Sequence, residues 1–296
     1  MICDAHCHFF SQQFLDILTK GTRLAEHGPE HVIGLLGWDP PGSAETLADR
    51  WVAELDRHGV SRAMLIASAP GDESSVATAT ARHPSRFVGL FMFNPVAADA
   101  EFRLERALEG GMRAIGLFPA MHGYHLDDQR VAGTFAAAAR QQAAVFVHCG
   151  ALTVGVRRKL GLPSAFDWRL GDPLGVAAVA IKFPTVPVIV PHFGAGFFRE
   201  ALMAADQCPT IHLDTSSSNG WIKYHPGLTL DEVLRRALDV VGAQRLLFGT
   251  DSSFFPRGWQ KGIYESQRAA LNGVGADQAV QDQIFSGNFN RLFPPR

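Results

Sequence analysis

Short apolar segments alternate with amphipathic segments along the whole chain. Eight apolar runs are rich in Val, Ile, Leu and Phe and show little strict polar alternation. They cover residues 2–9, 63–68, 87–93, 114–118, 144–148, 188–192, 210–214 and 245–250. Strands buried on both faces have this pattern, so the runs predict a parallel sheet with helices outside it.

The amphipathic segments between these runs predict the helices. One begins near Ser43 and ends at Gly59, which are typical start and stop residues. Within it, Leu47, Trp51 and Leu55 recur every four residues and share one face. Similar segments cover residues 72–83, 97–109, 127–141, 173–183, 196–207, 230–241 and 277–285.

Eight strands separated by helices in 296 residues favour a closed (β/α)8 TIM barrel, an α/β fold, over an open sheet. Neither a linker nor a repeat indicates a second domain, so we expect one barrel domain over residues 1–296. Three strand-to-helix connections are long: residues 10–42, 150–172 and 215–229. In this fold such connections form the C-terminal face, where active sites lie.

The composition restricts the class of partner. The chain is 47% hydrophobic and 19% charged with a formal net charge of -2, so it lacks the basic excess typical of nucleic-acid or anionic-membrane binding. No apolar run is long enough to span a bilayer, and the first residues do not resemble a signal peptide. We therefore expect a cytoplasmic protein with a small-molecule substrate. Its four cysteines are expected to be free thiols, and a homo-oligomer is compatible with the sequence.

The first strand, with the sequence DAHCHF, contains two histidines one residue apart. In a regular strand Asp4, His6 and His8 would share one face, with the cysteines on the other. Two interpretations stay open for the histidines by themselves: buried imidazoles satisfied by hydrogen bonds, or a metal-binding pair that needs further ligands. A zinc knuckle that includes Cys3 and Cys7 is disfavoured, because alternation points the thiols away.

Three other strand ends carry residues of the same kind. His148 ends the fifth strand in VFVHCG, His192 ends the sixth in VIVPHFGAG, and Asp251 ends the eighth in LLFGTDSSF. Each one alone could cap a strand, a helix or a turn. Together they put imidazole and carboxylate groups at one rim of a closed barrel, which favours a metal site.

These motifs, with the closing GNFNRLF, resemble the amidohydrolase superfamily, in particular its amidohydrolase-related branch similar to the aminocarboxymuconate semialdehyde decarboxylases. The resemblance covers essentially the whole chain. It implies a distorted TIM barrel with a divalent metal at the C-terminal mouth, bound by His6, His8, His148 and Asp251. It also implies that His192 acts beside the metal as an acid, a base or a polarising group. By its own chemistry, Asp251 could then relay a proton.

The donor set and two departures from the family narrow this expectation. Three imidazoles and one carboxylate suit Zn²⁺ best and Mn²⁺ or another transition metal less selectively, with a position left for water or substrate. Binuclear members carry a bridging lysine where this chain has Leu117 and Phe118, so we expect one metal ion. Nucleoside-type deaminases carry a glutamate where Ala151 stands, so deamination is disfavoured.

Four residues are candidates for substrate contact. Arg257 follows Asp251 by six residues and could bind a carboxylate through two hydrogen bonds. His122 and Tyr124 follow the fourth strand, where an ordinary polar loop is the alternative. Trp259, like Trp38 and Trp221, lies in a connection at this rim. These tryptophans could line an apolar pocket or pack loops.

The expected function is that of a mononuclear metal-dependent hydrolase, acting through a metal-activated water on a small organic acid derivative such as a lactone, ester or amide. The alternative is a metal-dependent non-oxidative decarboxylase of an aromatic or unsaturated carboxylic acid. A metal-free binding module on the same scaffold stays open as a third class.

Overall fold

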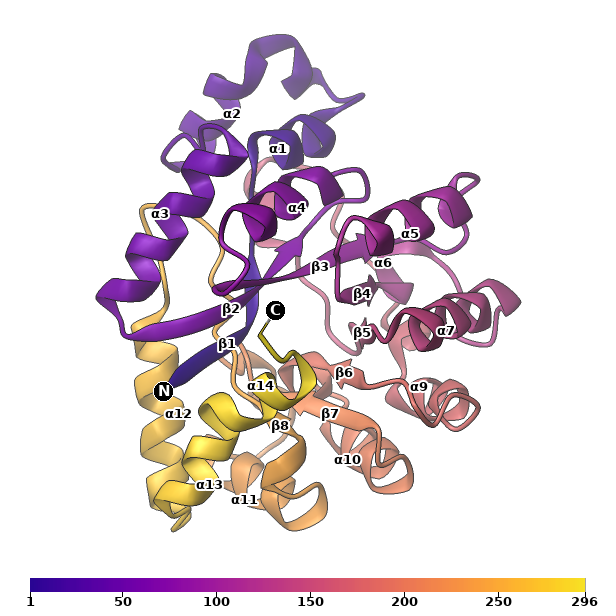
Figure 1. Cartoon of the computed structure of the whole chain (residues 1–296), viewed down its shortest axis with the longest axis vertical. Helices are drawn as coiled ribbons and strands as arrows, with labels where there is room; N and C mark the ends of the chain where they lie inside the picture. The colour runs from indigo at the N-terminus through magenta and orange to yellow at the C-terminus, as the bar shows by residue number, and fades with distance from the viewer. Residues whose placement is uncertain (296) are drawn as a thin grey trace.

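The computed structural model describes residues 1–295, and in them eight parallel strands pair in sequence order (Figure 1). The sequence predicted these strands and the barrel, and both are confirmed. The bounds are β1 Ile2–His8, β2 Val60–Ala67, β3 Phe87–Phe93, β4 Ala114–Leu117, β5 Ala144–Val147, β6 Val188–Val190, β7 Ile211–Asp214 and β8 Leu246–Leu247.

Helices surround the strands on the outside (Figure 1). Their bounds are α1 Gln12–Thr19, α2 Gly28–Leu36, α3 Ala44–Arg57, α4 Glu73–Arg82, α5 Ala100–Glu109, α6 Pro119–His122, α7 Gln129–Gln141, α8 Gly155–Lys159, α9 Pro173–Ala180, α10 Phe198–Gln207, α11 Leu230–Val240, α12 Lys261–Gly273, α13 Gln278–Asp282 and α14 Asn288–Leu292. None of the helices in the described chain is both long and apolar enough to cross a membrane.

Alternate strand residues divide the apolar side chains into two layers. In β2, Ala63, Leu65 and Ala67 pack between the barrel and the helices. Met64 and Ile66 point into the barrel, where they join Phe146 and other inward residues. Phe289 and Phe293, in and directly after α14, belong to this inner cluster, so α14 covers the barrel end seen in Figure 1. The opposite end is left for the site.

Three parts of the structure differ from the sequence-based expectation. The long connection expected after β1 contains two helices that were not predicted, α1 and α2. The first helix after β8 is α12, which the sequence analysis missed; it has no side-chain hydrogen bond at its N-cap, so the usual start signal is absent. The eighth strand was predicted over residues 245–250 but pairs with β7 only over Leu246–Leu247.

β8 is short because the chain beyond it turns toward β1, where it joins the last strand of the barrel to the first. Three backbone hydrogen bonds link the segment after β8 to β1: Ala5 N–H to Phe248 O (2.8 Å), Asp251 N–H to His6 O (2.9 Å) and His8 N–H to Ser252 O (2.7 Å). A backbone bridge between Cys7 and Ser252 continues this contact. The barrel is therefore joined by the same residues that carry the candidate site.

The fully buried carboxylate of Asp4 reinforces this junction. Its Oδ1 accepts the backbone N–H groups of His6 (2.9 Å) and Thr250 (3.1 Å). Its Oδ2 accepts the Thr250 hydroxyl (2.5 Å) and the indole N–H of Trp259 (2.8 Å). Burial raises the pKa of Asp4, and these donors oppose that shift. One buried side chain thus connects β1, the segment after β8 and the start of the connection to α12.

The junction gives a stability prediction. Trp259→Phe removes one of the four donors to buried Asp4, and a hydrogen bond contributes about 0.5 to 1.5 kcal/mol to stability. Trp51→Phe is the matched control, because Trp51 is equally buried while its indole N–H has no partner in the described chain. We expect Trp259→Phe to lower the free energy of unfolding by that additional amount in equilibrium urea unfolding. Equal losses in the two variants would contradict the role of the Asp4 hydrogen bond.

Candidate metal centre

A β-bulge in β1 aims the two histidines of DAHCHF into the barrel. Asp4 pairs with Ala63 and Cys7 with Leu65, so β1 holds one residue more than β2 between these pairs. Ala5 therefore packs inside the barrel, whereas Cys7 packs outside it against the helices. The expectation of regular alternation in β1 was wrong at this point, since Asp4 is engaged at the barrel junction while the histidines line the cavity.

Asp251 meets both histidines from the segment after β8. Its Oδ1 lies 3.1 Å from His8 Nε2 and 3.8 Å from His6 Nε2. Its backbone adopts the left-handed conformation (φ 61°), which is uncommon outside glycine and is held here by the hydrogen bond from Asp251 N–H to His6 O. One donor atom from each of the three residues lies within 4.8 Å of the others. Two imidazoles and a carboxylate thus converge as a metal site requires.

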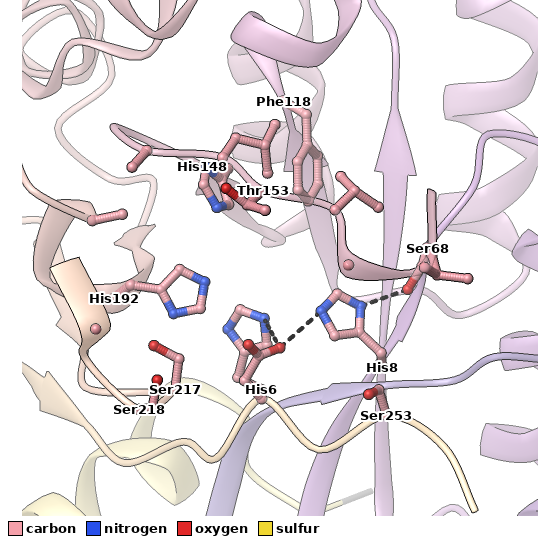
Figure 2. Close-up of a pocket in the computed structure, with 18 of the residues that line it drawn as sticks. His6, His8, Ser68, Phe118, His148, Thr153, His192, Ser217, Ser218 and Ser253 are labelled. Carbon is pink, nitrogen blue, oxygen red and sulfur yellow. Dashed lines mark hydrogen bonds and ion pairs between the residues drawn. The ribbon is translucent and has the colours of Figure 1, made fainter. Parts of the chain in front are cut away.

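Hydrogen bonds behind the two imidazoles orient them for this role. His6 Nδ1 lies 2.7 Å from Asp214 Oδ2. His8 Nδ1 lies 2.6 Å from Ser68 Oγ (Figure 2). The Ser68 hydroxyl donates to the Ile66 carbonyl (3.0 Å), so it accepts from His8. Both histidines therefore carry hydrogen on Nδ1, which leaves a lone pair on each Nε2, the form that binds a metal.

His148 provides a further free donor atom. It is buried, stacks on Phe118 (5.6 Å between ring centroids), and its Nδ1 has no hydrogen-bond partner in residues 1–295. A buried polar atom without a partner is uncommon and calls for an explanation such as an ion. His148 is outside the compact group of His6, His8 and Asp251, but its orphaned nitrogen fits the fourth ligand of the expected set.

His192 lies beside these residues because the ends of β5 and β6 meet closely. Gly150 makes the contact: a Cβ at this position would lie 2.2 Å from the carbonyl oxygen of Gly194, and its φ of +69° suits glycine. The ring of His192 is then 4.8 Å from that of His6 and 5.4 Å from that of His148. The hydroxyl oxygen of buried Ser216 lies 2.9 Å from His192 Nδ1. Figure 2 shows the His192 ring beside that of His6.

The electrostatics keep the carboxylates charged. Burial acts to raise the pKa of Asp251, but its contact with His8 and the other nearby imidazoles lower it well below the usual range. For Asp214, burial acts in the same direction and the contact with His6 outweighs it, so its pKa is also lowered. An ionised carboxylate is the form that a cation binds.

The four imidazoles of the site differ in the direction of their pKa shifts. Burial lowers the pKa values of His8 and His192, and lowers that of His148 further. Burial also acts to lower the pKa of His6, but Asp214 outweighs it and the net pKa is raised. A neutral imidazole is the form that coordinates a metal, so three of the four rings are already held in it.

A cavity of about 670 Å³ opens above the cluster. Its floor is formed by His6, His8, His148, His192 and Asp251. Its walls come from connections after several strands, including α1, α8 and the segment after β7. The three long connections predicted from the sequence therefore do border the cavity.

One wall of the cavity is a row of parallel aromatic rings. Phe10 stacks on Phe14 and on Trp38, with centroids 4.3 and 5.2 Å apart. Trp38 stacks on Phe254 at 4.6 Å, and the guanidinium of Arg257 lies 4.5 Å from the centre of the Phe254 ring. The cavity thus joins an apolar wall to a cation at its rim.

The sequence matches the family model described as amidohydrolase over residues 3–294. The chain belongs to the amidohydrolase family. This match confirms the resemblance and establishes the chain as an enzyme of a metal-dependent family. No curated protein matches the sequence.

Several solved structures share the fold of this chain. The 5-carboxyvanillate decarboxylase of Sphingomonas paucimobilis has a TM-score of 0.66 at 17% identity, over 100% of this chain and 99% of that chain. A probable 2-pyrone-4,6-dicarboxylic acid hydrolase of Acinetobacter baumannii has a TM-score of 0.61 at 15% identity, over 99% and 98%. An amidohydrolase of Burkholderia multivorans with bound zinc has a TM-score of 0.65 at 14% identity, over 100% of each chain. At these identities the similarity concerns the fold.

Some of the predicted substrate contacts line the cavity of the amidohydrolase barrel, and others do not. Arg257 lines the cavity, as do Trp38 and Trp221. Trp259 does not; it is buried against Asp4, where it stabilises the barrel junction. Tyr124 is buried in the core between barrel and helices, and His122 is absent from the cavity lining although its neighbour Met121 is present.

Three residues that contact the histidines of the site were not predicted from the sequence: Ser68, Asp214 and Ser216. All three follow or end strands, but only the folded barrel shows that they touch histidines. Asp214 had a usable signal, because an acidic residue ends the seventh apolar run as Asp251 follows the eighth. The serines had none, since hydroxyl residues at strand ends are also typical of turns.

The cluster gives a prediction about bound metal. His8→Ala should lose most of the metal that the purified protein carries and keep the barrel folded, because His8 lies at the rim and the inner core is elsewhere. His8 is a cleaner target than His6, whose removal would also leave buried Asp214 without its partner. Elemental analysis and circular dichroism measure both properties.

His122→Ala is the matched control, since His122 is a mostly buried histidine that does not line the cavity. It should retain the metal content of the unmodified protein. Unchanged metal content in His8→Ala would rule out His8 as a ligand.

Proposed function

We propose that this chain is a mononuclear metal-dependent hydrolase that acts on a small organic acid derivative, such as a lactone, ester or amide. The observation that carries the proposal is the convergence of His6 Nε2, His8 Nε2 and the Asp251 carboxylate on the floor of a cavity of about 670 Å³. Cavities of this volume accommodate small organic ligands.

The donor set favours Zn²⁺ as the ion, with Mn²⁺ or another transition metal as less selective alternatives. His6, His8 and Asp251 would hold it, and His148 would complete the set through its unpartnered Nδ1. When bound, such an ion polarises a substrate oxygen and lowers the pKa of a water to about 7.

The protein residues supply proton transfer, orientation and exclusion of water. Asp251 is ionised and in contact with the cluster, so it can accept a proton and pass it to a leaving group. His192, whose ring lies 4.8 Å from that of His6, provides a second group for proton transfer or for stabilising charge on the substrate. The aromatic wall of Phe10, Trp38 and Phe254 keeps that side of the cavity apolar.

The second candidate is a metal-dependent non-oxidative decarboxylase of an aromatic or unsaturated carboxylic acid. The flat aromatic wall next to Arg257 favours it, because a planar acid could lie along the wall with its carboxylate near the cluster. His192 or Asp251 would then move a proton to the carbon that loses the carboxylate.

A substrate panel on the metal-loaded enzyme separates the two candidates. Lactones, esters, amides and hydroxybenzoates are tested, with hydrolysis and carbon dioxide release followed side by side. Turnover of a lactone, ester or amide supports the hydrolase, and carbon dioxide release supports the decarboxylase. A protein that binds no metal and turns over none of them would contradict both and leave a binding module.

The cellular location and the partners of the enzyme are also part of the proposal. We propose that the enzyme acts in the cytoplasm on a small molecule, without a nucleic-acid or membrane partner, and a homo-oligomer is compatible with it. The four buried free cysteines support a reducing compartment.

Asp251 is predicted to act chiefly on turnover. Asp251→Asn removes charge and basicity with little change in shape, so kcat should fall by at least ~10²-fold while KM changes much less. Metal content is measured beside the kinetics to separate the loss of a ligand from the loss of a proton relay. Near-native kcat would make Asp251 a structural residue.

Arg257 is predicted to recognise an anionic group of the substrate. Its Nη2 donates to Ser253 Oγ (2.5 Å) and to the Asp251 carbonyl (3.2 Å), which fixes the guanidinium and leaves its other N–H groups free of these contacts. Arg257→Met should lower kcat/KM for an acidic substrate by about 10- to 100-fold, the value of a charged hydrogen bond, and that for its methyl ester much less.

Arg158→Met is the control for a general change in charge, because Arg158 is an exposed cation that does not line the cavity. It should affect acid and ester alike and only slightly. Equal penalties for acid and ester in Arg257→Met would mean that Arg257 supports its loop without binding the anion.

A further inference from the structure

Ser216 contacts two histidines of the site at once. Its Oγ lies 2.9 Å from His192 Nδ1 and 3.1 Å from His6 Nδ1. Ser216 is fully buried, and its backbone N–H donates to Asp214 Oδ1 (2.6 Å). The other oxygen of Asp214 accepts from His6. Asp214 and Ser216 therefore form one rigid unit behind both rings.

Asp214 determines which ring nitrogen of His6 carries the hydrogen. Asp214 is ionised and can only accept, so His6 Nδ1 is the donor in the 2.7 Å contact. The Ser216 hydroxyl then cannot donate to that nitrogen. Its hydrogen is therefore free to point elsewhere.

The hydrogen on His192 follows from what faces its Nδ1. Besides the Ser216 hydroxyl, the Ser216 carbonyl oxygen lies 3.3 Å from this nitrogen. A carbonyl oxygen only accepts, so a lone pair on His192 Nδ1 would repel it. A hydrogen on Nδ1 instead satisfies both oxygens.

We propose that Ser216 is a positioning residue that holds the hydrogen of His192 on Nδ1, so that the other ring nitrogen, Nε2, is unprotonated and can accept a proton. This inference rests on the proposed function, because His192 lines the cavity in which the reaction is placed. It makes resting His192 a proton acceptor, not a donor, and gives the buried segment after β7 a function in the chemistry of the site.

The direct test needs no substrate. Nitrogen-15 NMR of histidine-labelled, zinc-loaded enzyme distinguishes a ring nitrogen that carries hydrogen from one that does not, and His192→Gln identifies the signals of His192. We expect hydrogen on Nδ1 of His192 in the unmodified enzyme and a mixture of both forms in Ser216→Ala. Hydrogen on Nε2 in the unmodified enzyme would overturn the proposal.

Two further measurements separate positioning from a structural role. Ser216→Ala retains Asp214 behind His6, so metal content and thermal midpoint should stay near those of the unmodified enzyme. Ser218→Ala is the matched control, a neighbouring serine of the same segment without a histidine contact among the described residues, and it should leave the His192 signals unchanged. A loss of metal or of folding in Ser216→Ala alone would show that Ser216 is structural.

Once the substrate panel has identified a substrate, kinetics extend the test. Ser216→Ala should lower kcat by about 10-fold with little change in KM, since the tautomer of His192 affects proton transfer and not the shape of the cavity. Unchanged His192 signals and unchanged kcat in this variant would refute the proposal even if the enzyme proves to be a hydrolase.

Discussion

The junction between β1 and the segment after β8 is the constraint on which the rest of the structure depends. It closes the barrel through backbone hydrogen bonds and through buried Asp4, whose four donors come from both sides. The same junction places Asp251 against His6 and His8, 3.8 and 3.1 Å from their Nε2 atoms. Stability and chemistry are therefore coupled: a change that loosens the junction also moves a carboxylate away from two imidazoles.

Preorganisation of the site comes mainly from groups behind the ligands. Asp214 and Ser68 hold the hydrogens of His6 and His8 on Nδ1, and the lone pairs then face the cavity without further rearrangement. His148 differs, because its Nδ1 has no partner in the described chain and its ring is fixed by stacking on Phe118. Two of the proposed ligands are thus oriented by hydrogen bonds and the third imidazole by packing.

The sequence predicted the residues at the strand ends better than the contacts between them. His148 and Asp251 could be placed at one rim because parallel strands in a closed barrel end together. The bulge in β1 could not be predicted, since it depends on the pairing of β1 with β2. Trp259 looked like a pocket residue for a similar reason: its buried partner, Asp4, is 255 positions away in the chain. Ser68 lacked a signal because its partner histidine belongs to another strand.

The direction of the first proton transfer distinguishes the two proposed reactions. Hydrolysis begins when a water gives up a proton, so it needs an acceptor in the resting enzyme. Decarboxylation needs a donor for the carbon that loses its carboxylate. Asp251 is ionised, and with the hydrogen of His192 held on Nδ1 by Ser216, both groups at the cavity floor are acceptors. A resting site with two acceptors favours hydrolysis, whereas a decarboxylase would first have to take up a proton from its substrate or from water.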